Sequence, residues 1–193
     1  MTRTELVQAP RTVESQRRKL KLAIALVAYV TSIVLANVAT SYFGLVPIGF
    51  GLVVSAGSFA AGAALVLRDG VQVFGDRRYV FGAILIGAVL SFVMASPGIA
   101  FASCIAFLVS ELVDWGVFTP IRRKSLARAV VISSVVSAPV DTVLFLYLAG
   151  FGVTWQAVLG QFLVKTLMAL IAAGIITVLA RRRTSTPIGR PGL

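Results

Sequence analysis

The sequence predicts an all-α, polytopic membrane protein: a six-transmembrane-helix bundle with both termini on the cytoplasmic side. Hydrophobic residues make up 58% of the 193 residues and charged residues only 13%, against about 25% charged residues in soluble domains. The apolar residues also gather into six stretches near the length of about 20 residues that spans a bilayer. These stretches are Leu22–Phe43, Phe50–Leu67, Tyr79–Ala95, Gly98–Phe118, Ala129–Leu148 and Val153–Ala180.

The stretches indicate helices rather than strands, because they lack the apolar–polar alternation of a transmembrane β-barrel. They divide the chain into a basic tail (1–21), a transmembrane domain (22–180) and a second basic tail (181–193). Within these tails, Met1–Gln16 and Thr184–Leu193 are polar and contain Pro and Thr, and both are expected to be disordered. The first stretch follows basic residues, as in a signal peptide, but it is too long for one and is expected to be retained.

The basic residues predict the orientation. All of the 18 Lys and Arg residues except Lys165 lie before the first stretch, after the sixth, or in the connections that follow the second and fourth. The alternate connections carry no charge. The positive-inside rule therefore places both termini in the cytoplasm of a bacterial cell, with the helices in its cytoplasmic (inner) membrane.

A formal net charge of +11 can indicate nucleic-acid binding. Here the basic residues flank the predicted spans, where they are expected to contact anionic membrane lipids rather than nucleic acid.

Several classes of chemistry lack their residues. The chain has no histidine and a single cysteine, Cys104, so histidine catalysis and Cys or His metal sites are not expected. No phosphate-binding loop of the P-loop type is present. An intramembrane hydrolase that uses carboxylates stays conceivable, but no nucleophile–base pair is evident. We expect no enzyme, no metal and no cofactor.

Four charged residues lie inside the predicted spans: Glu111, Asp114, Asp141 and Lys165. A charge at the bilayer centre costs about 2.5–3.5 kcal/mol on insertion scales, so such a residue faces a partner, a cavity or a pathway. Asp141 and Lys165 fall at similar depths on neighbouring helices, which predicts an ion pair. Gln161 lies four residues before Lys165 and shares its helix face.

Glu111 and Asp114 share a helix face, with Trp115 on the same side. Two carboxylates beside an indole would suit a planar ligand rich in N–H groups. Alternatively, Trp115 only anchors the helix at the membrane interface. Asn37 on the first helix could contact a ligand or another helix, and Pro139 could open the fifth helix near mid-membrane or be a packing kink.

Four segments resemble a known family. They are Ala36-Asn37, Leu67-Arg68-Asp69-Gly70-Val71-Gln72-Val73-Phe74-Gly75, Ser110-Glu111-Leu112-Val113-Asp114 and Ser137-Ala138-Pro139-Val140-Asp141-Thr142-Val143-Leu144-Phe145. Together they resemble the bacterial VUT family, also called queuosine-precursor transporters, over residues 22–180. The resemblance implies secondary or facilitated uptake of a 7-deazaguanine such as 7-cyano-7-deazaguanine.

One segment departs from the family pattern. The better characterised members have an acidic residue followed by Tyr-Gly after the second helix, where this chain has Gln72 and Phe74-Gly75. The resemblance therefore leaves a vitamin open as the alternative solute. A deazaguanine presents an N1–H and an amino group side by side, which a carboxylate can accept together. Glu111 or Asp141 would accept them, Phe145 or Trp115 would stack on the base, and Gln72 and Asn37 would read its other edges.

The predicted solute-binding residues are Asn37, Gln72, Glu111, Asp114, Trp115, Asp141, Phe145 and Lys165. A second reading is a substrate-binding subunit of an energy-coupling-factor vitamin importer, which would need ATPase partners. The repeat Ala56, Ala60, Ala64 could serve as a docking face for such a partner or for a homodimer, or it could pack inside the bundle. A structural membrane protein without transport is disfavoured by the buried charges.

Overall fold

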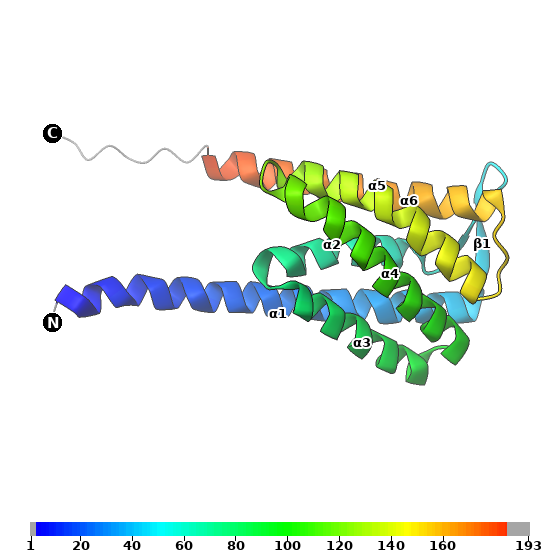
Figure 1. The fold of residues 1–193 in the computed structure, drawn as a ribbon, viewed down its shortest axis with the longest axis horizontal. Helices are drawn as coiled ribbons and strands as arrows, with labels where there is room; N and C mark the ends of the chain where they lie inside the picture. Colours follow the sequence, from blue (N-terminus) through cyan, green and yellow to red (C-terminus); the bar gives the residue numbers. More distant parts are fainter. Residues whose placement is uncertain (1–2, 185–193) are drawn as a thin grey trace.

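The computed structural model describes residues 3–184, with side chains described from 14 to 178. Its helices run roughly along one axis, with the start of α1 and the end of α6 at one end, and a β-hairpin that runs across this axis lies at the other (Figure 1). We call these the terminal end and the hairpin end. The elements are α1 (Arg3–Phe43), β1 (Leu45–Gly49), β2 (Leu52–Ser55), α2 (Ser58–Phe74), α3 (Arg77–Met94), α4 (Pro97–Arg122), α5 (Leu126–Leu148) and α6 (Trp155–Thr184).

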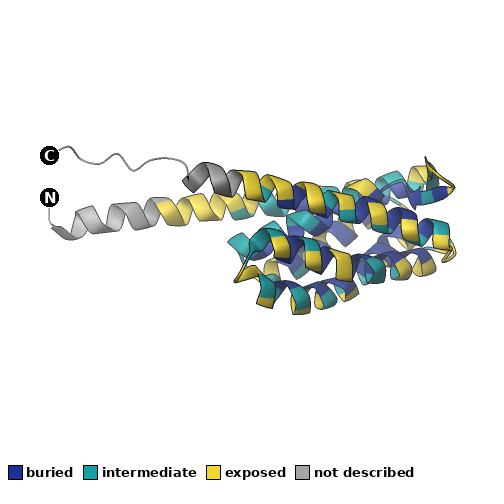
Figure 2. Cartoon of the chain, turned by 90° about the horizontal axis from the view of Figure 1, so that it is seen from above, coloured by how far each residue is buried: buried dark blue, intermediate teal, exposed yellow. Residues whose placement is uncertain are grey.

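The helical prediction is confirmed for the spans, and five of the described helices are long and apolar enough to cross a membrane. These are α1, α3, α4, α5 and α6. Figure 2 shows that their outward faces are exposed while their inward faces are buried. Large apolar side chains such as Val89, Leu112 and Ile175 are more than half exposed, as expected of a surface that meets lipid rather than water.

The prediction for the second stretch is wrong in its boundaries. Residues 45–55 form the antiparallel hairpin β1–β2, and α2 begins only at Ser58. The reason is local: Gly49 and Gly51 both have positive φ (95° and 72°), which glycine adopts at no steric cost. Together they turn the chain back on itself, and the apolar run that resembled the start of a helix forms a strand instead.

Because α2 starts later, it also ends later. It continues to Phe74, so Arg68 lies inside the helix and not in the connection to α3, where the charge pattern placed it. Its side chain is only 2% exposed. α2 is largely apolar but carries three buried polar side chains, those of Arg68, Asp69 and Gln72. It packs against α1, α3, α5 and α6, and Arg68 and Gln72 bond to side chains of α4.

Small residues allow close approach of α2 to its neighbours. A Cβ added at Gly57 would lie 2.0 Å from the carbonyl oxygen of Ala36, and one at Gly62 would lie 2.9 Å from Met168. Ala64, from the predicted alanine repeat, is fully buried in the core. Ala56 and Ala60 are only partly buried, and Ala56 lies before the start of α2, so of the three alanines Ala64 alone packs in the core.

Other expectations change at the helix ends. The first helix begins at Arg3 rather than Leu22, so the described part of the basic tail continues it. The sixth helix reaches Thr184, and the rest of the second tail lies outside the described residues. Pro139 does not break α5, which is continuous from Leu126 to Leu148.

Candidate functional site

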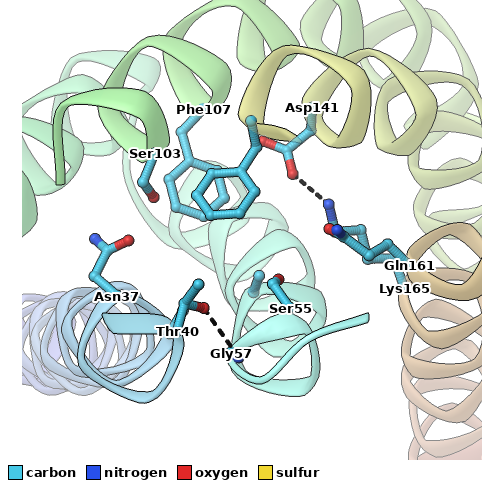
Figure 3. A pocket seen from close by; sticks show the side chains of 12 residues that line it. Asn37, Thr40, Ser55, Gly57, Ser103, Phe107, Asp141, Gln161 and Lys165 are labelled. Atoms are coloured by element: carbon cyan, nitrogen blue, oxygen red, sulfur yellow. Dashed lines mark hydrogen bonds and ion pairs between the residues drawn. The ribbon is translucent and has the colours of Figure 1, made fainter. Parts of the chain in front are cut away.

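A small polar cavity lies in the hairpin-end half of the bundle. Polar side chains from α1, α4, α5 and α6 point into it, with the hairpin and the start of α2 closing one side (Figure 3). We call it the polar cavity. Its lining residues are Ala36, Asn37, Thr40, Ser55, Gly57, Ala61, Ser103, Phe107, Asp141, Phe145, Gln161 and Lys165.

An ion pair forms one wall of the polar cavity. Nζ of Lys165 donates to Oδ2 of Asp141 at 2.6 Å and to Oγ1 of Thr142 at 2.8 Å. Both charged side chains are at most 5% exposed. This confirms the predicted pairing of α5 with α6. A carboxylate has about four lone-pair positions, so Lys165 leaves acceptor capacity on Asp141.

The opposite wall belongs to α1. Nδ2 of Asn37 donates to Oγ of Ser91 at 2.9 Å, so Asn37 links α1 to α3 while it lines the cavity. One turn later, Oγ1 of Thr40 accepts from the backbone N–H of Gly57 at 3.1 Å. These bonds hold the start of α2 against α1.

Gln161 provides a free donor. Its side chain is 1% exposed, and its Nε2 has no hydrogen-bond partner among the described residues. A buried unpaired donor costs about 1–3 kcal/mol. An acceptor on a bound molecule would offset this cost, so the polar cavity presents a donor at Gln161, acceptor capacity at Asp141 and two aromatic rings, Phe107 and Phe145.

The polar cavity is nearly closed. Its volume is about 20 Å³, which admits one or two water molecules. Small-molecule sites typically hold about 300–1,000 Å³. The structure is therefore an occluded conformation, and a purine-sized molecule would enter only after the helices move apart.

A second polar group lies one helical turn nearer the terminal end. It consists of Arg68, Asp69 and Gln72 on α2 with Glu111 and Asp114 on α4, and we call it the Arg68 cluster. Nη2 of Arg68 is 2.6 Å from Oδ1 of Asp114 and 3.2 Å from Oδ1 of Asp69, and its Nε is 3.2 Å from Oε2 of Glu111. Gln72 donates through Nε2 to Oε1 of Glu111 at 2.7 Å.

An apolar layer separates the two sites. Tyr29, Ala64 and Phe107 belong to one buried hydrophobic cluster. Ala64 lies one turn before Arg68, and Phe107 lies one turn before Glu111. Phe107 also lines the polar cavity. It therefore lies between the cavity and the Arg68 cluster.

The eight predicted site residues therefore separate into three places. Asn37, Asp141, Phe145 and Lys165 meet at the polar cavity, whereas Gln72, Glu111 and Asp114 belong to the Arg68 cluster. Trp115 joins neither. Its side chain is 44% exposed, and its ring lies 4.3 Å from the guanidinium carbon of Arg77.

Sequence reasoning missed Arg68, Asp69, Ser103 and Phe107. The two α4 residues had a usable signal, since 103, 107 and 111 recur every four residues on one helix face. For Arg68 and Asp69 the sequence signal is weaker. The apolar residues Val71, Val73 and Phe74 follow them with no proline between, which indicates that the helix continues beyond the two charges. They were missed because a charge at the end of an apolar run normally marks a connection.

Residues 22–179 match the family model described as "putative vitamin uptake transporter". The chain belongs to this family. The match runs from the middle of α1 to residue 179 in α6, so both the polar cavity and the Arg68 cluster lie within it. The VUT protein is thus a multi-pass membrane protein of a transporter family. Comparison with curated proteins and with solved structures gave no match.

Proposed function

We propose that the protein imports a small planar solute, a queuosine precursor such as 7-cyano-7-deazaguanine, by a secondary or facilitated mechanism. The observation that carries this proposal is the polar cavity: it combines hydrogen-bonding side chains with aromatic rings inside a bundle whose outside is apolar. A flat heterocycle with polar edges is complementary to such a lining.

The roles follow from the contacts. Asp141 would accept the adjacent N–H groups of the base, and Gln161 would donate to one of its acceptors. Phe145, which is 8% exposed and tilted 46° against Phe151, would contact the face of the ring. Lys165 keeps Asp141 paired in the occluded state, and Asn37 reads a further edge.

The orientation supports uptake into a cell. The helix ends at the terminal end carry the basic residues, which the positive-inside rule places in the cytoplasm of a bacterium. The polar cavity then lies in the outer half of the cytoplasmic membrane and the Arg68 cluster in the inner half. Import would move the solute past Phe107.

The test uses Gln161→Leu, with Gln156→Leu as the matched control on the same helix. Binding of radiolabelled 7-cyano-7-deazaguanine to the purified protein should weaken about ten-fold or more in Gln161→Leu, a loss of about 1.4 kcal/mol. Gln156 does not line the cavity, so its variant should bind as the unaltered protein does. Unchanged binding in Gln161→Leu would reject the cavity as the solute site.

The importer-subunit reading is tested by reconstitution. The purified chain alone, in lipid vesicles, should equilibrate the labelled solute across the membrane. Transport that appears only after ATPase subunits are added would reject a stand-alone carrier. A panel of vitamins in the same vesicles separates the deazaguanine from the vitamin as solute.

A further inference from the structure

The charges of the Arg68 cluster do not balance. Three carboxylates, those of Asp69, Glu111 and Asp114, surround a single guanidinium at 2.6–3.2 Å. All four side chains are at most 2% exposed. Arginine stays protonated in proteins, so three ionised carboxylates would leave two uncompensated negative charges in the low-dielectric interior.

The charged groups on the neighbouring helices do not form ion pairs with these carboxylates: within residues 14–178 the three carboxylates pair with Arg68 alone. Lys165 of α6 is paired with Asp141 of α5. Arg122, at the end of α4, donates through Nη1 to the backbone oxygen of Gln72 at 3.3 Å. The guanidinium of Arg77 instead lies over the rings of Phe81 and Trp115, at 4.9 and 4.3 Å.

Four carboxylate oxygens of the cluster are buried without a hydrogen-bond partner among the described residues: Oδ2 of Asp69, Oε2 of Glu111, and Oδ1 and Oδ2 of Asp114. Two of them, Oε2 of Glu111 and Oδ1 of Asp114, lie within ion-pair distance of Arg68, which leaves the two Oδ2 atoms without any donor. The Oδ1 atoms of the same two side chains share one nitrogen, Nη2 of Arg68. Two carboxylates held so close are most stable when one of them carries a proton.

The cluster also borders the molecular surface. Asp69 lines an apolar groove of about 410 Å³ between α1, α2, α5 and α6, together with Lys21, Gly70 and Phe74 near the terminal end. Gly70 has no atom within 4 Å of an added Cβ, so it keeps this side of α2 open. The groove places the side chain of Asp69 close to the surface of the bundle, next to Lys21 of α1.

We propose that the Arg68 cluster is a proton-binding site, distinct from the polar cavity, in which the carboxyl group of Asp69 holds a proton beside the side chain of Asp114. The proton comes from water and is held as a neutral carboxyl group. Coupling to transport rests on the proposed function: because Phe107 separates the two sites, a movement of α4 that opens the cavity also moves Glu111 and Asp114, and this changes how tightly the proton is held.

The proton site is tested without any solute. Infrared spectra of the purified protein in lipid are recorded at several pH values. The difference between the spectra at low and high pH should show the C=O stretch of a protonated carboxyl group. The band should disappear in Asp69→Asn and in Asp114→Asn, and stay in Asp76→Asn, the matched control, whose side chain is 64% exposed. Absence of the band at every pH at which the protein is folded would overturn the proposal, as would its persistence in both cluster variants.

A second measurement needs no variant. An apolar carbodiimide reacts with protonated carboxyl groups: the carboxyl proton moves to a carbodiimide nitrogen and the carboxyl oxygen adds to its central carbon. Peptide mass spectrometry should find this adduct on Asp69 or Asp114 and not on Asp76. An adduct on Asp76 alone would count against the cluster.

Coupling is tested in vesicles with labelled 7-cyano-7-deazaguanine. An imposed proton gradient should drive accumulation by the unaltered protein, and Asp114→Asn should lose that accumulation while it keeps solute exchange without a gradient. If the unaltered protein carries no solute at all, the proposed function fails and the infrared result still decides the proton site. Accumulation by Asp114→Asn equal to that of the unaltered protein would overturn the coupling.

Discussion

The polar cavity and the Arg68 cluster are both buried, both polar and one helical turn apart, yet their charges are arranged differently. In the cavity one cation meets one anion, Lys165 and Asp141, and a donor of Gln161 stays free. In the cluster one cation meets three anions. A site with equal numbers of positive and negative charges and an unpaired donor suits a neutral polar solute. A site with more carboxylates than cations suits a proton. The contrast assigns different tasks to residues that the sequence had grouped together.

The largest effect is expected for Arg68→Met. Arg68 is the one guanidinium among the described residues that pairs with the three buried carboxylates. Its loss should cost about 3–5 kcal/mol, so little folded protein should reach the membrane. Lower pH should partly restore thermal stability, since protonated carboxyls need no counter-charge. Arg78→Met is the control, because the Arg78 side chain is 77% exposed. Thermal unfolding in detergent measures both, and a stable Arg68→Met would show that the carboxylates are already neutral.

The next effect concerns the balanced pair. Asp141→Leu or Lys165→Met alone leaves one buried charge unpaired and should lower the thermal midpoint and abolish uptake. The charge swap Asp141→Lys with Lys165→Asp should recover folded protein, because the pair is restored. Size-exclusion profiles and labelled-solute uptake of the three variants provide the measurement. If the double variant does not recover folded protein, the position of each side chain matters and not only the presence of an ion pair.

A third variant separates the two sites. Glu111→Gln keeps the shape of the side chain and does not alter the lining of the polar cavity. It should fold and bind solute, but uptake should fall by about ten-fold or more, because the charge beside Arg68 changes. Binding and uptake measured on the same preparation decide this. If binding falls as much as uptake, Glu111 is part of the solute site.

The smallest effect is expected for Trp115→Leu. The indole is 44% exposed and contacts Arg77, an interaction worth about 0.5–1 kcal/mol at an exposed site. Thermal stability should fall slightly and uptake should change less than about two-fold, a difference below 1 kcal/mol. A large loss of uptake would return Trp115 to the solute pathway.

Prediction from sequence succeeded where a residue's surroundings follow from the bilayer. The apolar runs that became α1, α3, α4, α5 and α6 could be recognised because an exposed face in lipid must be apolar along its whole length. The Asp141–Lys165 pair could be recognised because two opposite charges at equal depth have few other partners. Prediction failed for Arg68, which stands where a loop charge is normal.

The sequence by itself determined a helical membrane bundle with its basic residues gathered near one end, because insertion into lipid depends on the composition of each segment. Only the tertiary structure decided that a hairpin precedes α2, that Arg68 turns inward, and that Glu111 and Asp141 belong to different sites. Those outcomes depend on which side chains meet across helices. Hydropathy along the chain does not show which side chains meet. The structure does, for example where Gly57 approaches Ala36 and Gly62 approaches Met168.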